Sequence, residues 1–209
     1  TITGYATNDT LSGGDGNDVV YGQAGDDVLD GGAGTDNVQG GEGNDTLKGG
    51  ADADSLSGGN GADSLQGDAG NDGVYGDAGN DVLDGGAGND NLGGGTGADV
   101  YLFGLGSGQD TVYNYDGEAL GTKADTVQLG AGITPASVTL TRSGEDLLIA
   151  INGSSDSLRV SYYFNTDGAS PYAVENIRFA DGTSWDVATV KAQVLVATAG
   201  NDTITGYAT

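Results

Sequence analysis

The sequence predicts an all-β protein: a solenoid of short stacked strands, followed by a small β-rich domain with one short helix. Two observations carry this prediction. From Gly4 to Leu102 the chain repeats a nine-residue pattern, and from about Asn114 that pattern gives way to ordinary strand-like segments. A fixed short period is typical of stacked repeats, each of which buries its apolar side only against its neighbours. We therefore expect three regions, at residues 1–113, 114–196 and 197–209.

Three positions of the repeat are invariant if Gly4 is counted as position one. Position one is always glycine, position six is always aspartate and position eight is always apolar. The aspartates are Asp9, Asp18, Asp27, Asp36, Asp45, Asp54, Asp63, Asp72, Asp81, Asp90 and Asp99. The apolar residues are Leu11, Val20, Leu29, Val38, Leu47, Leu56, Leu65, Val74, Leu83, Leu92 and Tyr101. A degenerate further repeat follows after a two-residue offset, with Gly106, Gly108, Asp110 and Val112 in the corresponding places.

Each invariant position has a physical reason. Glycine permits positive φ and the close approach of successive turns, and the short residues after each aspartate read as a brief strand. One aliphatic side chain in nine residues is too little to bury alone, but stacked turns build a continuous ladder of Leu and Val. A disordered Gly/Asp linker is the alternative, and the strict period disfavours it. Asp15, Asp30 and Asp84 lie outside position six, and we expect them to be only solvated.

Composition narrows the function. The chain has no Cys and no His, which removes the usual zinc and copper ligands and leaves the oxygen donors that suit calcium or magnesium. Acidic residues number 31 against 6 basic, a net charge of -25, so nucleic acid and anionic membrane surfaces are disfavoured as partners. No apolar run is long enough to insert into a membrane. Without His, Cys or a recognisable catalytic motif, we expect no enzymatic activity.

The repeat resembles the RTX nonapeptide, Gly-Gly-x-Gly-x-Asp-x-apolar-x, a calcium-binding pattern. It stands here as Gly13-Gly14-Asp15-Gly16-Asn17-Asp18-Val19-Val20-Tyr21 with ten further near-copies. The resemblance implies a right-handed parallel β-roll with two nonapeptides per coil, so that turns on one edge are 18 residues apart. Calcium ions would lie between such turns, at about nine sites by this rule.

The resemblance also implies the ligands. The carboxylates would come from the eleven position-six aspartates and Asp110. Backbone carbonyls would come from the glycine-rich turns, at Gly14, Gly16, Gly25, Gly32, Gly34, Gly41, Gly43, Gly59, Gly61, Gly70, Gly79, Gly86, Gly88, Gly95 and Gly97. Some turns depart from the pattern: Tyr5 and Thr7 replace both inner glycines of the first, whose site we expect to be incomplete. Asp52 replaces a glycine in the turn opening at Gly49, as either an extra carboxylate or a distortion.

The second half predicts strands over residues 125–129, 137–141, 147–151, 158–164 and 177–179, and a short helix over 185–195 capped by Ser184 or Asp186. The order of these segments resembles the haemolysin-type calcium-binding-related domain, which implies a cap on the open end of the roll. Tyr163, Phe179 and Trp185 are predicted to be core aromatics, with a sugar-binding patch as the alternative.

The segment Thr1–Thr7 recurs verbatim as residues 203–209, which suggests one unit of a tandem array beside neighbouring copies of itself. The resemblance implies an extracellular or cell-surface protein of a Gram-negative bacterium, exported by type I secretion and folded by external calcium. The leading interpretation is a rigid spacer in an adhesin-like protein. The alternatives are a glycan-binding module, which only scattered tyrosines such as Tyr21 and Tyr75 support, and the secretion and folding module of a secreted enzyme or toxin.

Overall fold

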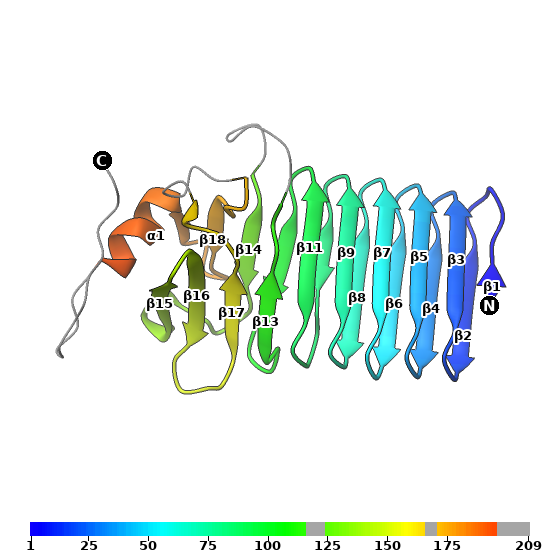
Figure 1. The fold of residues 1–209 in the computed structure, drawn as a ribbon, viewed down its shortest axis with the longest axis horizontal. Coiled ribbons are helices and arrows are strands. Elements are labelled where there is room, and N and C mark those ends of the chain that lie inside the picture. The colour runs from blue at the N-terminus through cyan, green and yellow to red at the C-terminus, as the bar shows by residue number, and fades with distance from the viewer. Residues whose placement is uncertain (116–123, 166–170, 196–209) are drawn as a thin grey trace.

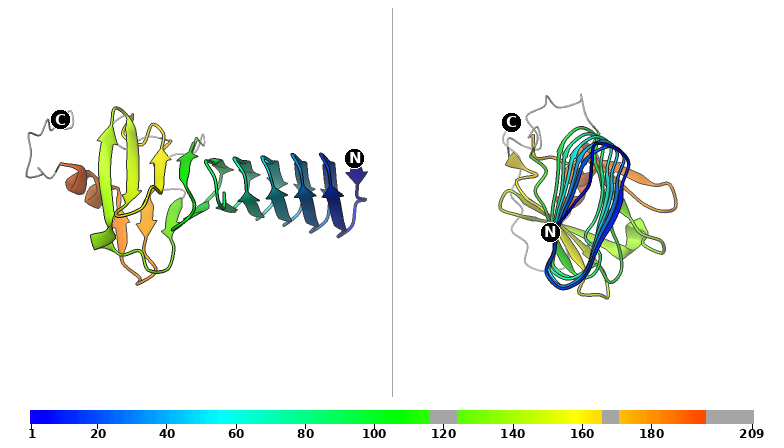
Figure 2. Two further views of the ribbon diagram at one scale, coloured as in Figure 1. Left: turned by 90° about the horizontal axis from the view of Figure 1, so that it is seen from below. Right: turned by 90° about the vertical axis from the view of Figure 1, so that its right-hand side faces the viewer.

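The computed structural model describes residues 1–115, 124–165 and 171–195. It is an elongated β-solenoid of about six turns, built from two sheets that face each other along the whole length (Figure 1). The N-terminus lies at one end, and the single helix of the described residues lies at the other (Figure 2). The predicted fold class is confirmed.

The strands alternate between the two sheets along the chain. The first sheet contains, in spatial order, β1 (Ile2–Thr3), β3 (Val19–Ala24), β5 (Asn37–Glu42), β7 (Ser55–Asn60), β9 (Gly73–Ala78), β11 (Asn91–Thr96), β13 (Gln109–Val112), β17 (Ser157–Val160), β16 (Asp146–Ile151) and β15 (Val138–Ser143). The second contains β19 (Ser184–Asp186), β18 (Asn176–Arg178), β14 (Thr126–Leu129), β12 (Val100–Phe103), β10 (Val82–Asp84), β8 (Ser64–Ala69), β6 (Thr46–Ala51), β4 (Val28–Ala33) and β2 (Thr10–Asp15). A 3₁₀ turn, η1 (Pro135–Ser137), precedes β15.

The register between coils follows the repeat. Val38 lies opposite Leu56 in the first sheet and Leu29 lies opposite Leu47 in the second, so parallel neighbours are 18 residues apart. The predicted coil of two nonapeptides is therefore confirmed. At the two-residue offset the step becomes 20, with Leu92 opposite Val112.

The core between the sheets is a narrow ladder of the position-eight side chains. From Val20 to Leu92 each is at most 1% exposed, whereas Leu11, in the first full coil, is only partly buried. Position one must be glycine because the next coil and the aspartate of the same repeat leave no room for a Cβ. A Cβ on Gly40 would lie 2.5 Å from the carbonyl oxygen of Gly58 in the next coil.

Both parallel sheets continue past residue 113. β13 pairs in parallel with β17, and β14 pairs in parallel with β18, before antiparallel partners complete each sheet: β16 and β15 in the first, β19 in the second. A solenoid otherwise ends on open strand edges and an open core, so this arrangement closes the end of the ladder. Residues 197–209, the third expected region, lie outside the described residues.

Two predictions for the second half need correction. The strand expected over 158–164 ends at Val160, because the chain turns at Tyr162 with a left-handed φ of 56°. The helix, α1 (Val187–Val194), begins two residues later than expected, and Trp185 belongs to β19 instead. Asp186 caps α1 by accepting a hydrogen bond from the backbone N–H of Thr189, as predicted.

The three aromatics of the second half are core residues. Tyr163, Phe179 and Trp185 are at most 7% exposed, and the rings of Phe179 and Trp185 pack edge to face with centroids 4.6 Å apart. Their interpretation as core side chains is confirmed, and they form no sugar-binding patch on the surface.

Candidate calcium sites along the two edges of the roll

The position-six aspartates form two continuous ladders, one along each edge of the roll. The backbone N–H of each donates to Oδ1 of the equivalent carboxylate one coil later, as from Asp27 to Asp45 and from Asp36 to Asp54, at 2.8 Å. The same bond recurs at 2.7–3.0 Å along each edge. The predicted pairing of aspartates 18 residues apart is therefore present.

The second oxygen of these carboxylates is left without a partner. Oδ2 is buried and makes no hydrogen bond in Asp27, Asp36, Asp45, Asp54, Asp63, Asp72, Asp81 and Asp90. Each of these side chains is at most 5% exposed. A buried carboxylate oxygen without a hydrogen bond or a counter-charge is costly, so this arrangement calls for a cation.

Burial changes the pKa of these carboxyl groups. Desolvation raises the pKa of Asp45, Asp54, Asp72 and Asp81 to about 6, and repulsion from neighbouring aspartates adds to the effect. The pKa of Asp63 and Asp90 is raised for the same first reason, and that of Asp110 reaches about 7. In the absence of a cation, the ionised form of these carboxyl groups is therefore destabilised in the folded chain.

Carbonyl oxygens of the turns point towards the next coil. A Cβ on Gly34, at position four, would lie 2.6 Å from the carbonyl oxygen of Gly16, the position-four residue one coil earlier. The same holds at position two, where a Cβ on Gly59 would collide with the carbonyl oxygen of Gly41. The space between successive turns is therefore bordered by backbone oxygens, and glycine at these two positions keeps a Cβ out of it.

The donors present fit calcium. Carboxylate and backbone carbonyl oxygens are the ligands that this hard cation prefers. Within the described residues no three acidic side chains gather at one point, so most of any oxygen shell has to come from the backbone. The position-six aspartates would hold the ions together with the turn carbonyls, and bound calcium would supply the missing positive charge.

The turns that lack a glycine keep its backbone conformation. Gln23, Asp68 and Asp77 at position two, and Asp52 at position four, all have φ between 70° and 88°. The carbonyl oxygen of Asp52 lies against Gly70 as a glycine carbonyl would, so Asp52 does not distort its turn. The first turn does differ, because Oδ2 of Asp9 accepts a hydrogen bond from the backbone N–H of Tyr5 at 2.7 Å.

Sequence reasoning found the continuation of one ladder, at Asp110, but missed that of the other, at Asp125 and Glu175. Asp90 donates its N–H to Asp110, and Asp99 donates its N–H to Asp125, which in turn donates to Glu175. The signal was present, since Asp125-Thr126-Val127 and Glu175-Asn176-Ile177 repeat the acidic-x-apolar order of positions six to eight. The irregular spacing of the second half concealed it.

A second ladder, at position five, was also missed. The side-chain oxygen of Asn17 accepts the backbone N–H of Thr35, and that of Asn44 accepts the N–H of Ala62. These bonds run from the later coil to the earlier one, opposite to those of position six. Among the aspartates expected to be only solvated, Asp15 and Asp30 are exposed, but Asp84 is half-buried and accepts the N–H of Gly86.

The fold and the oxygen-lined edges define a calcium-binding β-solenoid. Residues 3–38, 39–74, 66–101, 75–112 and 191–208 match the family described as RTX calcium-binding nonapeptide repeat (4 copies), and residues 146–189 match the haemolysin-type calcium binding protein related domain. The chain belongs to the RTX calcium-binding nonapeptide repeat family.

Similar proteins include the iron-regulated protein FrpA of Neisseria meningitidis serogroup C, 48% identical over 107 residues, which make up 51% of this chain and 9% of FrpA. The chain therefore matches only a small part of that relative. Among solved structures, the AlgE6R3 subunit of the Azotobacter vinelandii mannuronan C5-epimerase is 25% identical with a TM-score of 0.40, covering 75% of this chain and 92% of that one. The extracellular lipase LipA of Serratia marcescens is 21% identical with a TM-score of 0.29, covering 75% and 36%.

Proposed function

We propose that this chain is a structural module of a secreted protein, which folds when calcium fills the edges of its roll and then acts as a rigid spacer. The observation that carries the proposal is the series of buried, unpartnered Oδ2 atoms between Asp27 and Asp90. A chain that buries so many carboxylates without counter-charges is poorly stable alone, and a cation that binds only the folded form adds its binding free energy to folding.

Charge explains why the chain would stay unfolded without calcium. Residues 1–113 carry 20 acidic side chains and one basic one, Lys48, so the cation-free region repels itself. About nine between-turn ions would nearly cancel this charge. One ladder reaches Asp125 and Glu175 and the other reaches Asp110, which supports calcium sites up to the capping strands.

Folding that depends on calcium is suited to a protein that is exported from the cell. An expanded, self-repelling chain is a suitable state for passage through a type I secretion channel, and extracellular calcium modules work at high external calcium. We therefore place the folded module outside the cell, on the surface of a Gram-negative bacterium, without catalytic activity of its own. Within the described residues, no helix has the length and apolar character needed to cross a membrane.

The test is a far-UV circular dichroism titration of the metal-depleted chain with calcium, with magnesium as the control. The proposal expects a cooperative gain of β signal with calcium, reversed by a chelator, and little response to magnesium. A chain that is fully folded without calcium, or one that responds equally to magnesium, would overturn it.

A further inference from the structure

An exposed cluster of tyrosines lies on the outer face of the first sheet, where the regular coils meet the capping strands. Tyr75, Tyr113, Tyr115 and Tyr162 are 44–52% exposed, which is high for large aromatic side chains. Tyr172 joins them, with its ring centroid 5.0–5.4 Å from those of Tyr113, Tyr115 and Tyr162. The sequence interpretation of scattered tyrosines is therefore wrong for Tyr75, because the fold adds four more from distant segments.

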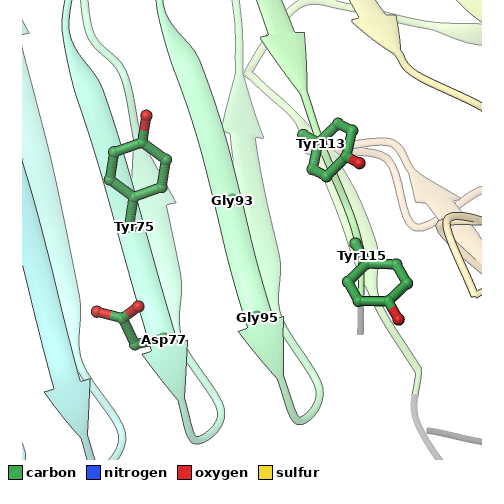
Figure 3. Close-up of a pocket in the computed structure, with 6 residues that line it drawn as sticks. All are labelled: Tyr75, Asp77, Gly93, Gly95, Tyr113 and Tyr115. Atoms are coloured by element: carbon green, nitrogen blue, oxygen red, sulfur yellow. The ribbon is translucent and has the colours of Figure 1, made fainter. Parts of the chain in front are cut away.

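Three neighbouring segments build a shallow hollow here (Figure 3). Tyr75 and Asp77 come from β9, Gly93 and Gly95 form the floor on β11, and Tyr113 and Tyr115 follow β13 on the far side. Its volume is about 230 Å³. This is below the roughly 300–1,000 Å³ of pockets that enclose a drug-sized molecule, so it suits one part of a longer ligand.

The repeat pattern is broken at this place in a way that the calcium sites do not require. Gly73 is the only glycine at position seven and Gly93 is the only glycine at position nine among the eleven repeats. A Cβ at Gly73 would lie 3.1 Å from the Tyr75 ring, and one at Gly93 would lie 3.3 Å from it. Neither position faces the core. The two glycines make room for the ring of Tyr75 to lie along the sheet.

One residue of the cluster adopts an unfavourable backbone conformation that the repeat does not explain. Tyr162 has φ 56°, in the left-handed region that disfavours residues with a Cβ, whereas the φ of 75° at Asp77 is the ordinary one of position two. The turn at Tyr162 is held by Asp146, which accepts its N–H at 2.9 Å and pairs with Arg159 at 2.9 Å. Such strain often accompanies functional sites.

We propose that this tyrosine cluster, with Asp77 beside it, is a binding site for a neutral oligosaccharide. Figure 3 shows Tyr75 on one side of β11 and Tyr113 with Tyr115 on the other, so exposed aromatic rings border the floor of Gly93 and Gly95 on both sides. A pyranose ring has an apolar face of C–H groups that stacks on such a surface, and a rim of hydroxyls that need partners. The tyrosine hydroxyls and the Asp77 carboxylate supply them.

The geometry and charge select among ligands. A quaternary ammonium group is best held when aromatic rings enclose it on several sides, whereas this hollow has a floor of two glycines and aromatic rings only at its two sides. The carboxylate of Asp77 in the hollow disfavours anionic glycans. β9 and β13 flank β11, so Tyr75 and Tyr113 stand about 10 Å apart. The row from Tyr75 to Tyr172 therefore suits a chain of sugars.

The test is a glycan array probed with the calcium-saturated chain, followed by calorimetric titration of the neutral oligosaccharide that binds best. Tyr75→Ala and Tyr113→Ala should each weaken binding about tenfold or more. Asp77→Gly restores the usual glycine at a positive φ, so it should preserve folding while weakening binding about fivefold. Tyr21→Ala is the matched control, because Tyr21 occupies the position of Tyr75 on β3 of the same sheet, away from the cluster.

Calcium-induced circular dichroism of every variant separates this inference from the proposed function, since the fold can respond to calcium whether or not a sugar binds. The absence of saturable binding to any neutral glycan would overturn the inference. Binding that the Tyr75 and Tyr113 variants leave unchanged would also overturn it, as would binding of choline in preference to sugars.

Discussion

The backbone N–H of Asp63 donates to Oδ1 of Asp81 at 2.8 Å, while Oδ2 of Asp81 is buried without a hydrogen-bond partner. Asp27, Asp45, Asp63 and Asp81 on this edge therefore have two different oxygens: Oδ1 fixes the stacking of the coils, and Oδ2 is buried beside the position-one glycine of its own repeat without a hydrogen-bond partner. Either a carboxylate or an amide oxygen can accept the stacking hydrogen bond made by Oδ1. A negative charge at Oδ2 is needed only if a cation binds there.

Asp63→Asn should separate these two roles. The amide keeps Oδ1 as an acceptor for Asp45, and its NH₂ group takes the place of Oδ2. A Cβ on Gly58 would meet both this Oδ2 and the carbonyl oxygen of Gly76, so that carbonyl is a candidate acceptor for the NH₂ group. We expect the calcium midpoint of folding to rise several-fold, because one charged ligand is lost, without loss of stability in the metal-free chain. Circular dichroism titration measures both quantities.

Asp30→Asn is the matched control. Asp30 is an exposed aspartate at position nine, on strand β4, which belongs to the same sheet as the strand β8 that follows Asp63. The substitution should leave the calcium midpoint unchanged. An equal rise for Asp30→Asn and Asp63→Asn would mean that overall charge, rather than the position-six carboxylate, governs calcium binding.

Gly59→Ala should destabilise the roll more than Gly14→Ala. Both glycines occupy position two with positive φ, 109° and 91°, so each substitution incurs a similar backbone penalty of about 1–2 kcal/mol. A Cβ on Gly59 also collides with the carbonyl oxygen of Gly41 in the preceding coil, whereas a Cβ on Gly14 meets nothing within 4 Å. We expect about 1–3 kcal/mol of additional loss at Gly59.

Urea unfolding in saturating calcium measures this difference. Equal urea midpoints for the two alanine variants would show that backbone conformation alone explains the conserved spacing of glycines within the repeats, and that contact between coils adds nothing.

The pH should act in opposite directions with and without calcium. The pKa of Asp45, Asp54, Asp72 and Asp81 is about 6 in the folded chain, and that of Asp110 about 7. These values exceed the unfolded value of about 3.9, so the calcium-free fold binds protons more tightly than the unfolded chain. The contribution of these groups to stability is fully present below about pH 4 and is lost as the pH rises through their folded pKa values of about 6 to 7.

Calcium binding needs the same carboxyl groups deprotonated, so the calcium midpoint should rise as the pH falls from 7.5 to 5.5. Circular dichroism of chain depleted of metal on a chelating resin, at pH 5 and pH 8, tests the first effect, and titrations at the two pH values test the second. A metal-free chain with more β signal at pH 8 than at pH 5 would contradict the burial of these charges.

The repeat made most of the roll predictable, because a period of nine places each residue by counting. The ladder from Val20 to Leu92 and the recurrence of the aspartates follow from it, whereas the 18-residue register was implied by the resemblance to the RTX nonapeptide. A period of nine no longer predicts the positions beyond Asp99. The step to the next coil is 20 residues from Asp90 to Asp110 and 26 residues from Asp99 to Asp125, so Asp125 was missed. The tyrosine cluster could not be predicted either, since Tyr75 and Tyr172 are brought together only by the path of the capping strands.

Asn114→Ala should weaken the junction between the roll and its cap. Asn114 is fully buried, accepts the hydroxyl hydrogen of Tyr101 through Oδ1, and donates from Nδ2 to Asp125 at 2.7 Å and to the carbonyl oxygen of Ala173 at 3.1 Å. Tyr101 in turn accepts the N–H of Gly94, and Asp125 accepts that of Asp99. Removing the amide leaves several buried polar groups unsatisfied at once.

We expect a loss of about 2–4 kcal/mol for Asn114→Ala, since each unsatisfied buried group costs about 1–3 kcal/mol and relaxation recovers part of it. Asn91→Ala is the matched control, because Asn91 is an exposed asparagine on β11. Urea unfolding in saturating calcium should show a lower midpoint for Asn114→Ala alone. If the two variants unfold together, the polar chain from Gly94 to Asp125 does not hold the cap, and apolar contacts of Val127 and Leu158 with the ladder do so instead.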